Sequence, residues 1–227
     1  MGKTLIFLFW IIVSSVNGQT IPSDYKSTIK SIIKNRDAYC EFYAMGDSVT
    51  KDSIVGSARN YLIYELTQHV FPAWYGTPWD FYGTTRTPGQ GAIACGYFVT
   101  NVLSDIGFII PRIRWAQDPS EVFIKKLVEK ENIKRFHNRS VGVVESYLKE
   151  KGEGIYLVGL DRHVGFISVN GDKIRFVHSS YYQPEIGVMS EQLNSKNPLK
   201  YSKYRVIGKL FSDEMVVNWI TGYEYGK

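Results

Sequence analysis

The chain of 227 residues has little cysteine, since only Cys40 and Cys95 are present, and it has only four histidines. Two cysteines do not make the disulfide framework of a small secreted scaffold, and they lack the paired spacing of a structural zinc site. Charge of one sign is also scarce, because acidic and basic residues are interspersed around a net charge of +5. This composition indicates a soluble protein with a solvated surface and disfavours a nucleic-acid partner.

Long hydrophobic runs are missing apart from Leu5–Val13, which is too short to span a bilayer. Lys3 precedes this run, and the small residues Val16 and Gly18 follow it. The pattern is typical of a secretory signal peptide, so we expect cleavage after residue 18. The mature chain would then be a secreted or periplasmic monomer without a membrane span, with a net charge of +4 because Lys3 is lost.

Helical patterns come first along the rest of the chain. A short amphipathic helix at 24–36 falls in residues 19–50, which we interpret as an N-terminal helical extension of a domain at 51–227. A stronger helix is predicted from Ser53 to His69, with Pro72 ending it. Two more helices are predicted at 118–129 and 140–151.

Alternating, β-branched patterns come second. They predict strands at 155–160, 163–169, 173–178 and 204–211. Helices followed by an antiparallel sheet predict an α+β fold.

Cys95 lies between a glycine-rich turn, residues 88–94, and a predicted helix whose apolar face ends before Gly107. The unpaired N–H groups and the dipole at a helix N-terminus favour a thiolate and lower the pKa of a thiol there. The alternative for a secreted chain is a disulfide between Cys95 and Cys40, in which Cys95 would not be a nucleophile.

Asn170 and Gly171 separate two alternating runs and predict a β-hairpin with a type I′ turn. In such a hairpin Val169 faces Asp172, and continuing the register pairs His163 directly with His178. Both imidazoles then lie on the apolar face of Ile167, Ile174 and Phe176, where we expect the Cys95 helix to pack.

Two adjacent histidines are an unusual choice for a core, because all four ring nitrogens need partners and two imidazolium ions repel each other. Three alternatives remain. The histidines are satisfied structural residues, or they bind zinc together with Cys95, or they serve a nucleophilic cysteine as base and orienting group. The other two histidines, His69 and His137, have no such pairing and are interpreted as surface residues.

The cysteine at a helix start, the strand beginning His163-Val164-Gly165-Phe166 and the second histidine on the next strand resemble the NlpC-type cysteine peptidases of bacterial cell walls. The resemblance covers about residues 75–180. It implies a papain-like fold with Cys95 as nucleophile, His163 as general base and His178 as orienting group, and it implies no cofactor or metal. This chain has Ala94-Cys95-Gly96-Tyr97 where family members usually have Asp-Cys-Ser-Gly, so we expect a distant branch.

By the same resemblance Tyr82 is a candidate oxyanion donor, and Gln90 is a rival by analogy with papain. Trp79 and Phe81 are candidates for lining the substrate cleft. The implied activity is hydrolysis of an amide in peptidoglycan stem peptides or another peptide through a thioester. The alternatives are a non-catalytic secreted binding module on the same fold and a papain-like enzyme acting on other amides or esters.

Overall fold

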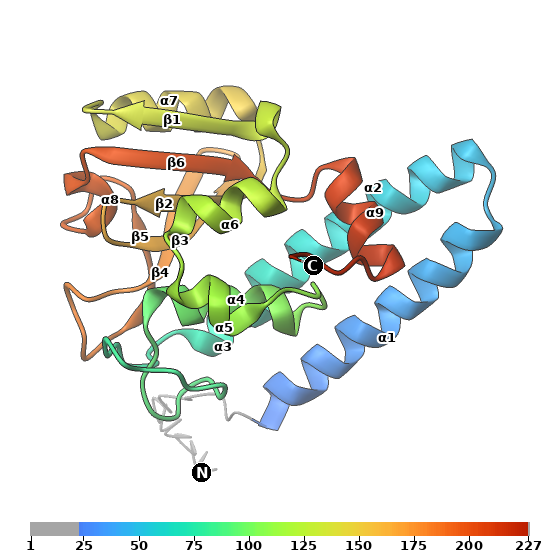
Figure 1. The fold of residues 1–227 in the computed structure, drawn as a ribbon, viewed down its shortest axis with the longest axis horizontal. Coiled ribbons are helices and arrows are strands. Elements are labelled where there is room, and N and C mark those ends of the chain that lie inside the picture. Colours follow the sequence, from blue (N-terminus) through green and yellow to red (C-terminus); the bar gives the residue numbers. More distant parts are fainter. Residues whose placement is uncertain (1–22, 227) are drawn as a thin grey trace, which may run out of the picture.

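The fold is α+β, as predicted, and is organised around one antiparallel sheet (Figure 1). The computed structural model describes residues 23–226, so the predicted signal peptide lies outside the described residues. The six strands have the spatial order β1-β6-β2-β3-β4-β5. Their bounds are β1 Ile133–His137, β2 Gly154–Leu160, β3 Val164–Asn170, β4 Lys173–Ser179, β5 Val188–Gln192 and β6 Tyr204–Lys209.

The helices come mostly before the sheet in sequence, and they pack on both of its faces. Their bounds are α1 Ser23–Met45, α2 Ser48–Glu65, α3 Phe71–Trp74, α4 Cys95–Asp105, α5 Arg112–Gln117, α6 Ser120–Leu127, α7 Val141–Lys151, α8 Pro198–Tyr201 and α9 Asp213–Thr221, with a π-helical turn η1 at Leu66–Val70 and a 3-10 turn η2 at Lys130–Asn132. The helices α1 and α2 form a long hairpin that extends away from the sheet (Figure 1).

The helix α1 is longer than the predicted segment at 24–36, and it shares the main core with the other helices. Its Ile32 is fully buried, and the Tyr25 hydroxyl donates a hydrogen bond to Asp105 of α4 at 2.8 Å. The predicted boundary before residue 51 falls inside α2, whose first turn is capped by Asp47. The predicted extension therefore packs as part of the helical layer.

The chain stays helical through Pro72, so the prediction that Pro72 ends the second helix is wrong. In the π-helical turn η1 the N–H of Phe71 donates to the carbonyl of Leu66. Pro72 follows in the first turn of α3, where a missing N–H costs nothing because that group has no partner within the helix. The helical path then continues to Trp74, which is fully buried.

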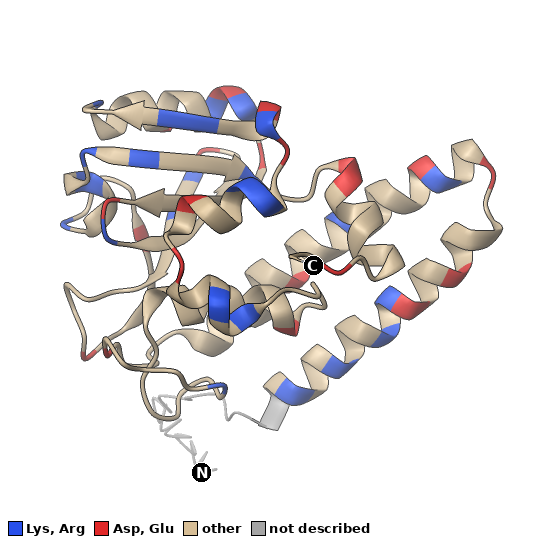
Figure 2. Ribbon diagram, viewed as in Figure 1, with Lys and Arg blue, Asp and Glu red and all other residues tan. Residues whose placement is uncertain are grey.

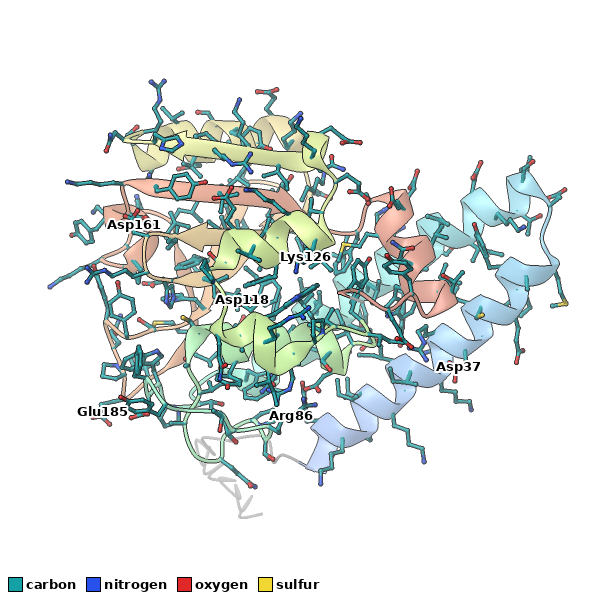
Figure 3. All side chains as sticks on the ribbon, viewed as in Figure 1. Asp37, Arg86, Asp118, Lys126, Asp161 and Glu185 are labelled. Carbon is teal, nitrogen blue, oxygen red and sulfur yellow. The ribbon has the colours of Figure 1, made fainter. Side chains whose placement is uncertain are left out.

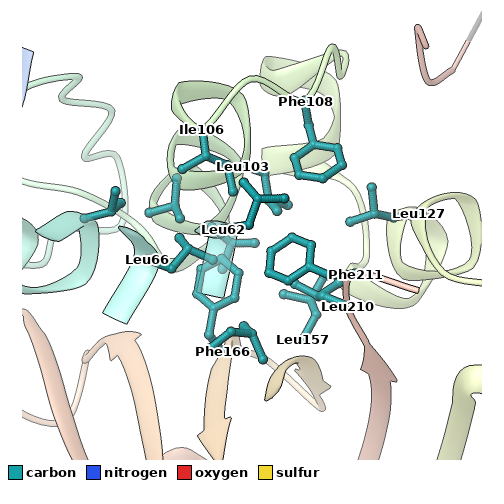
Figure 4. Packing of buried hydrophobic residues seen from close by; sticks show 14 of the residues in the cluster. Leu62, Leu66, Leu103, Ile106, Phe108, Leu127, Leu157, Phe166, Leu210 and Phe211 are labelled. Atoms are coloured by element: carbon teal, nitrogen blue, oxygen red, sulfur yellow. The ribbon is translucent and has the colours of Figure 1, made fainter. Parts of the chain in front are cut away.

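The sheet separates two buried clusters. On one face Phe166 of β3 packs on Phe98 of α4, with ring centres 6.0 Å apart, within the large cluster drawn in Figure 4. On the other face a second cluster joins strand residues to the helices α7 and α8. Its members include Ile167, Ile174 and Phe176 from the strands, Val144 and Leu148 from α7 and Leu199 from α8.

The Cys95 helix therefore packs on the face opposite to the predicted one. All seven residues of β2 are buried, which shows that the central strands have apolar neighbours on both faces. An apolar alternation marks a buried face but does not say which helix covers it when both faces are buried. The face of Ile167 and Phe176 is covered by α7 and α8.

The β3–β4 hairpin turns one residue later than predicted. Asn170 pairs with Lys173, so Gly171 and Asp172 are the central residues, and of these two only Gly171 has positive φ, at 53°. This is the pattern of a type II′ turn, in which glycine takes the first central position. The predicted direct pairing of His163 with His178 is wrong. Displacing the turn by one residue moves the β4 partner of each β3 residue by two positions. Because side chains alternate between the two faces of a strand, residues predicted to share a face still share it.

Charged side chains are distributed over the whole molecule, as expected from the sequence (Figure 2). The described part of α1 has its lysines in the first half and Asp37 and Glu41 further along, and β1 has only basic charged residues. Across residues 23–226 no helix is long and apolar enough to cross a bilayer.

Candidate active site

Cys95 is the first residue of α4, and its sulfur is surrounded by backbone donors. Ala94 is extended and accepts the N–H of Phe98 at 2.9 Å, which starts the helix one residue before the thiol. The backbone N–H groups of Val164, Gly96 and Cys95 itself lie near the sulfur and favour its thiolate form. Gly96 is needed for the packing of α4 on α5, because a Cβ at this position would lie 2.2 Å from the carbonyl oxygen of Ala116.

Burial raises the pKa of the Cys95 thiol, and the three backbone N–H groups oppose this rise without cancelling it. We predicted that the helix N-terminus would lower this pKa, and that prediction is wrong for the net effect. The donors are present, but the loss of hydration of a thiolate outweighs them. The resting form of Cys95 is therefore a thiol that needs a base to react.

The two histidines of the hairpin are in direct contact. His163 Nε2 lies 2.8 Å from His178 Nδ1, although the two residues are diagonal rather than opposed in the register. The imidazole of His178 stacks on the ring of Phe176 at 4.0 Å between centres, with 14° between the planes. Both histidines are buried, and desolvation lowers the pKa of each, to about 3 for His178.

Glu191 on β5 extends this chain of contacts, and no sequence pattern predicts it. Its Oε1 lies 2.8 Å from His178 Nε2, and its side chain is only 12% exposed. Burial raises the pKa of the Glu191 carboxyl, while Asn197 and Arg175 counter the rise. The sequence Val188-Met-Ser-Glu-Gln192 has little strand character, so neither the strand nor its acidic residue was indicated by the pattern.

The backbone just after His163 passes near Cys95, while the His163 imidazole packs beside Phe176 on the opposite face of the sheet. Among the backbone N–H groups that favour the Cys95 thiolate is that of Val164, the residue that directly follows His163. Tyr181 lies beside His163, with 5.3 Å between the two ring centres. The turn before His163 is fixed by Asp161 (Figure 3), whose carboxylate accepts the backbone N–H groups of Lys203 at 2.7 Å and Tyr204 at 3.1 Å.

Buried polar atoms without partners gather around this place. Among the described residues four buried side-chain atoms have no hydrogen-bond partner, and they include His163 Nδ1, Ser180 Oγ and Trp79 Nε1. Buried polar groups in proteins are nearly always paired, so such a group calls for an explanation, and a catalytic role is one. The free Nδ1 of His163 is the atom that a general base would use.

A hollow of about 200 Å³ opens beside His163. Tyr181, Tyr182, Tyr201 and Arg162 contribute to its lining. Larger hollows of about 610 Å³ at the α1–α2 hairpin and about 810 Å³ beside β1 and α7 contain neither Cys95 nor the paired histidines. Of these three hollows only the small one is lined by His163, and neither Cys95 nor His178 belongs to its lining.

The other predicted site residues lie on the loop before α4. Trp79 packs on Tyr181 with ring centres 6.0 Å apart, so it is one ring removed from His163. Phe81 and Tyr82 are 70% and 83% exposed and pack edge to face on each other.

Two oxyanion candidates were predicted on this loop, and they occupy different parts of it. Tyr82 adjoins the active-site turn, because the next residue, Gly83, accepts the N–H of Ala94 at 2.8 Å. Gln90 is exposed in a turn further from Cys95, where its own N–H donates to Thr87.

Both cysteines are free, so the alternative of a Cys40–Cys95 disulfide is not realised. Within residues 23–226 no group of three or more His, Cys, Asp or Glu side chains is arranged to hold a metal ion. His69 and His137 are exposed, as predicted.

Comparison of the chain with protein-family models, with curated protein sequences and with solved structures gives no match. The functional assignment therefore depends on the geometry of the site and on the resemblance of the sequence motifs.

Proposed function

We propose that the protein is a secreted cysteine hydrolase of NlpC type that cleaves an amide bond through a thioester on Cys95. The observation that carries the proposal is the buried pair of His163 and His178, joined at 2.8 Å. The Nδ1 of His163 has no partner, and the next residue, Val164, has a backbone N–H that favours the Cys95 thiolate. A neutral imidazole suits the role of general base toward a neutral thiol, and general-base catalysis contributes about 10²- to 10⁴-fold in rate.

In the proposed reaction the Cys95 sulfur attacks the carbonyl carbon of the substrate amide while its proton moves to His163 Nδ1. The backbone N–H groups of Cys95 and Gly96 lie at the free end of the helix and stabilise the oxyanion that forms next to the sulfur. Tyr82 and Gln90 remain candidates for a further donor. The imidazolium of His163 then gives its proton to the leaving amine, which breaks the C–N bond.

Hydrolysis of the thioester completes the cycle. A water molecule gives a proton to His163 and attacks the acyl carbon, and the sulfur of Cys95 leaves and regains a proton. Substrate groups beside the scissile bond occupy the hollow next to His163, where tyrosine rings and Arg162 suit a peptide with a carboxylate. The resemblance favours stem peptides of peptidoglycan as the substrate.

The test is digestion of purified muropeptides followed by mass spectrometry of the new amines and carboxylates. We expect the chain without residues 1–18 to release a stem-peptide fragment and the Cys95→Ala variant to release none. If the wild-type protein leaves muropeptides intact but forms a thioester with an activated ester, the substrate is another amide or ester. If no acyl group ever attaches to Cys95, the protein is not a cysteine hydrolase.

A further inference from the structure

We propose that Glu191 is a positioning residue whose carboxylate fixes the tautomers of both histidines and leaves His163 Nδ1 unprotonated. The consequence for catalysis rests on the proposed function. The tautomer assignment itself does not, because it follows from the contacts of the free protein.

The contacts form one uninterrupted line of hydrogen-bonding atoms. Glu191 Oε1 lies 2.8 Å from His178 Nε2, and His178 Nδ1 lies 2.8 Å from His163 Nε2. The line ends at His163 Nδ1, which is buried and has no partner. The His178 side chain is fully buried, so water does not provide an alternative partner along the line.

Counting protons along the line determines each tautomer. A carboxylate only accepts hydrogen bonds, so His178 must carry its proton on Nε2 and donate it to Glu191. Neutral His178 then has a bare Nδ1 that accepts from His163, which must carry its proton on Nε2. Neutral His163 is consequently unprotonated at Nδ1, and this is the atom that takes the proton of Cys95 in the proposed reaction.

A neutral Glu191 would reverse every bond in the line. A protonated carboxyl would donate to His178 Nε2, His178 would donate from Nδ1, and His163 would hold its only proton on Nδ1. The base would then be lost without any atom moving far. The charge of Glu191, rather than its shape, is therefore the property that the site needs.

Two neighbours of Glu191 favour its charged form, and the strand register holds the side chain in place. In the β4–β5 register Glu191 is paired with Phe176, whose ring stacks on His178, so the carboxylate and the imidazole are held on the same face. Arg175 and Asn197 are the groups near Glu191 that favour its ionised form, against the cost of burial. Arg175 itself is anchored to the backbone oxygen of Ser190, the residue before Glu191.

The experiment is a long-range ¹H–¹⁵N NMR correlation of the histidine rings in the free protein at neutral pH. The nitrogen shift distinguishes protonated from unprotonated ring nitrogens, and there are only four histidines to assign. We expect His163 and His178 both to carry the proton on Nε2. A proton on Nδ1 of His163 in the wild-type protein would overturn the inference without the need for any variant.

Two variants and one control test the role of the charge. In Glu191→Gln we expect a shift of His163 toward the Nδ1–H tautomer and a loss of kcat of about 10²- to 10⁴-fold with little change in KM, as found when a catalytic triad loses its orienting carboxylate. Glu191→Asp should retain the wild-type tautomers and recover part of kcat. Glu185→Gln removes an exposed carboxylate from the neighbouring β4–β5 loop (Figure 3) and should change neither quantity.

The outcomes separate this inference from the proposed function. If the Nε2–H tautomers depend on Glu191 but the protein forms no acyl-enzyme, the inference about Glu191 holds and the proposed function is wrong. If the enzyme cleaves an amide but Glu191→Gln changes neither the histidine tautomers nor kcat, the inference about Glu191 is wrong and the proposed function still holds.

Discussion

Gly165 leaves no space for a side chain at the point where β3 passes the histidine pair. A Cβ at this position would lie 2.7 Å from a ring carbon of Phe176, 2.8 Å from the Cβ of His178 and 2.9 Å from the carbonyl oxygen of Val177. Nonbonded carbon atoms prefer separations of about 3.5–4.0 Å, so Gly165→Ala requires His178 and Phe176 to move by roughly 1 Å.

The cost of this movement can be estimated. Insertion of a methyl group into a packed core costs about 1–3 kcal/mol, which corresponds to a fall of roughly 2–12 °C in Tm for a domain of this size. A displacement of about 1 Å at a catalytic group also costs on the order of 10²-fold in rate. We therefore expect Gly165→Ala to lower both the Tm and the kcat, with the larger relative effect on kcat.

The assays are thermal unfolding followed by circular dichroism and kcat on a cleaved muropeptide. Gly56→Ala is the matched control, because a Cβ on this residue of α2 meets no atom within 4 Å. Alanine is the better helix former, so the control should gain up to about 1 kcal/mol of stability and keep its kcat. An unchanged Tm in Gly165→Ala would refute the packing argument, and a lower Tm with full kcat would refute the link from packing to the histidines.

Three further predictions concern the site. In steady-state assays Cys95→Ala and His163→Ala should abolish turnover, while His178→Ala should retain a reduced rate. An equal loss of rate in all three variants would mean that the base and the orienting group are wrongly assigned. Burial lowers the pKa of both histidines, to about 3 for His178, so the unfolded chain binds protons that the native state does not. The free energy of unfolding should therefore fall as the pH falls below 6.5. Urea unfolding at several pH values should show a shallower pH slope in His178→Gln, and an equal slope would contradict the assignment. Arg162→Gln should raise the KM for carboxylate-bearing peptides but not for their amides, and equal KM changes for both would exclude Arg162 as a carboxylate contact.

The parts of the fold that were predicted correctly are those with long local patterns. The helix that begins at Cys95 has five apolar residues on one face and a glycine with positive φ after its end, and the observed helix spans Cys95–Asp105. The strands β2, β3, β4 and β6 are runs rich in apolar and β-branched residues. Their period of two also placed His163 and His178 on one face, because that assignment survives a turn that is displaced by one residue.

The missed parts depend on contacts that a local pattern does not contain. The edge strands β1 and β5 are short and polar, and they form because β6 and β4 offer free backbone partners. The packing side of α4 was missed because both faces of the central strands are buried. Glu191 was missed for both reasons, since its strand is not evident from the sequence and its partner His178 lies on a neighbouring strand.

The pKa of Cys95 shows a third kind of limit. A helix N-terminus is visible in the sequence, and it predicted a stabilised thiolate. The depth at which the sulfur is buried is a property of the folded chain, and burial is the larger influence on this pKa. The chemistry consequently moves from a preformed thiolate to a thiol that depends on His163.

The dependence of Cys95 on His163 can be measured directly by alkylation with iodoacetamide near neutral pH, with the two cysteines quantified separately by peptide mass spectrometry. Cys40 is free and exposed on α1, so it reports the intrinsic rate in the same sample. We predict that His163→Ala slows labelling of Cys95 by about 10²-fold or more and leaves Cys40 unchanged. Labelling of Cys95 at the same rate with and without His163 would contradict the assignment of His163 as the base that activates Cys95.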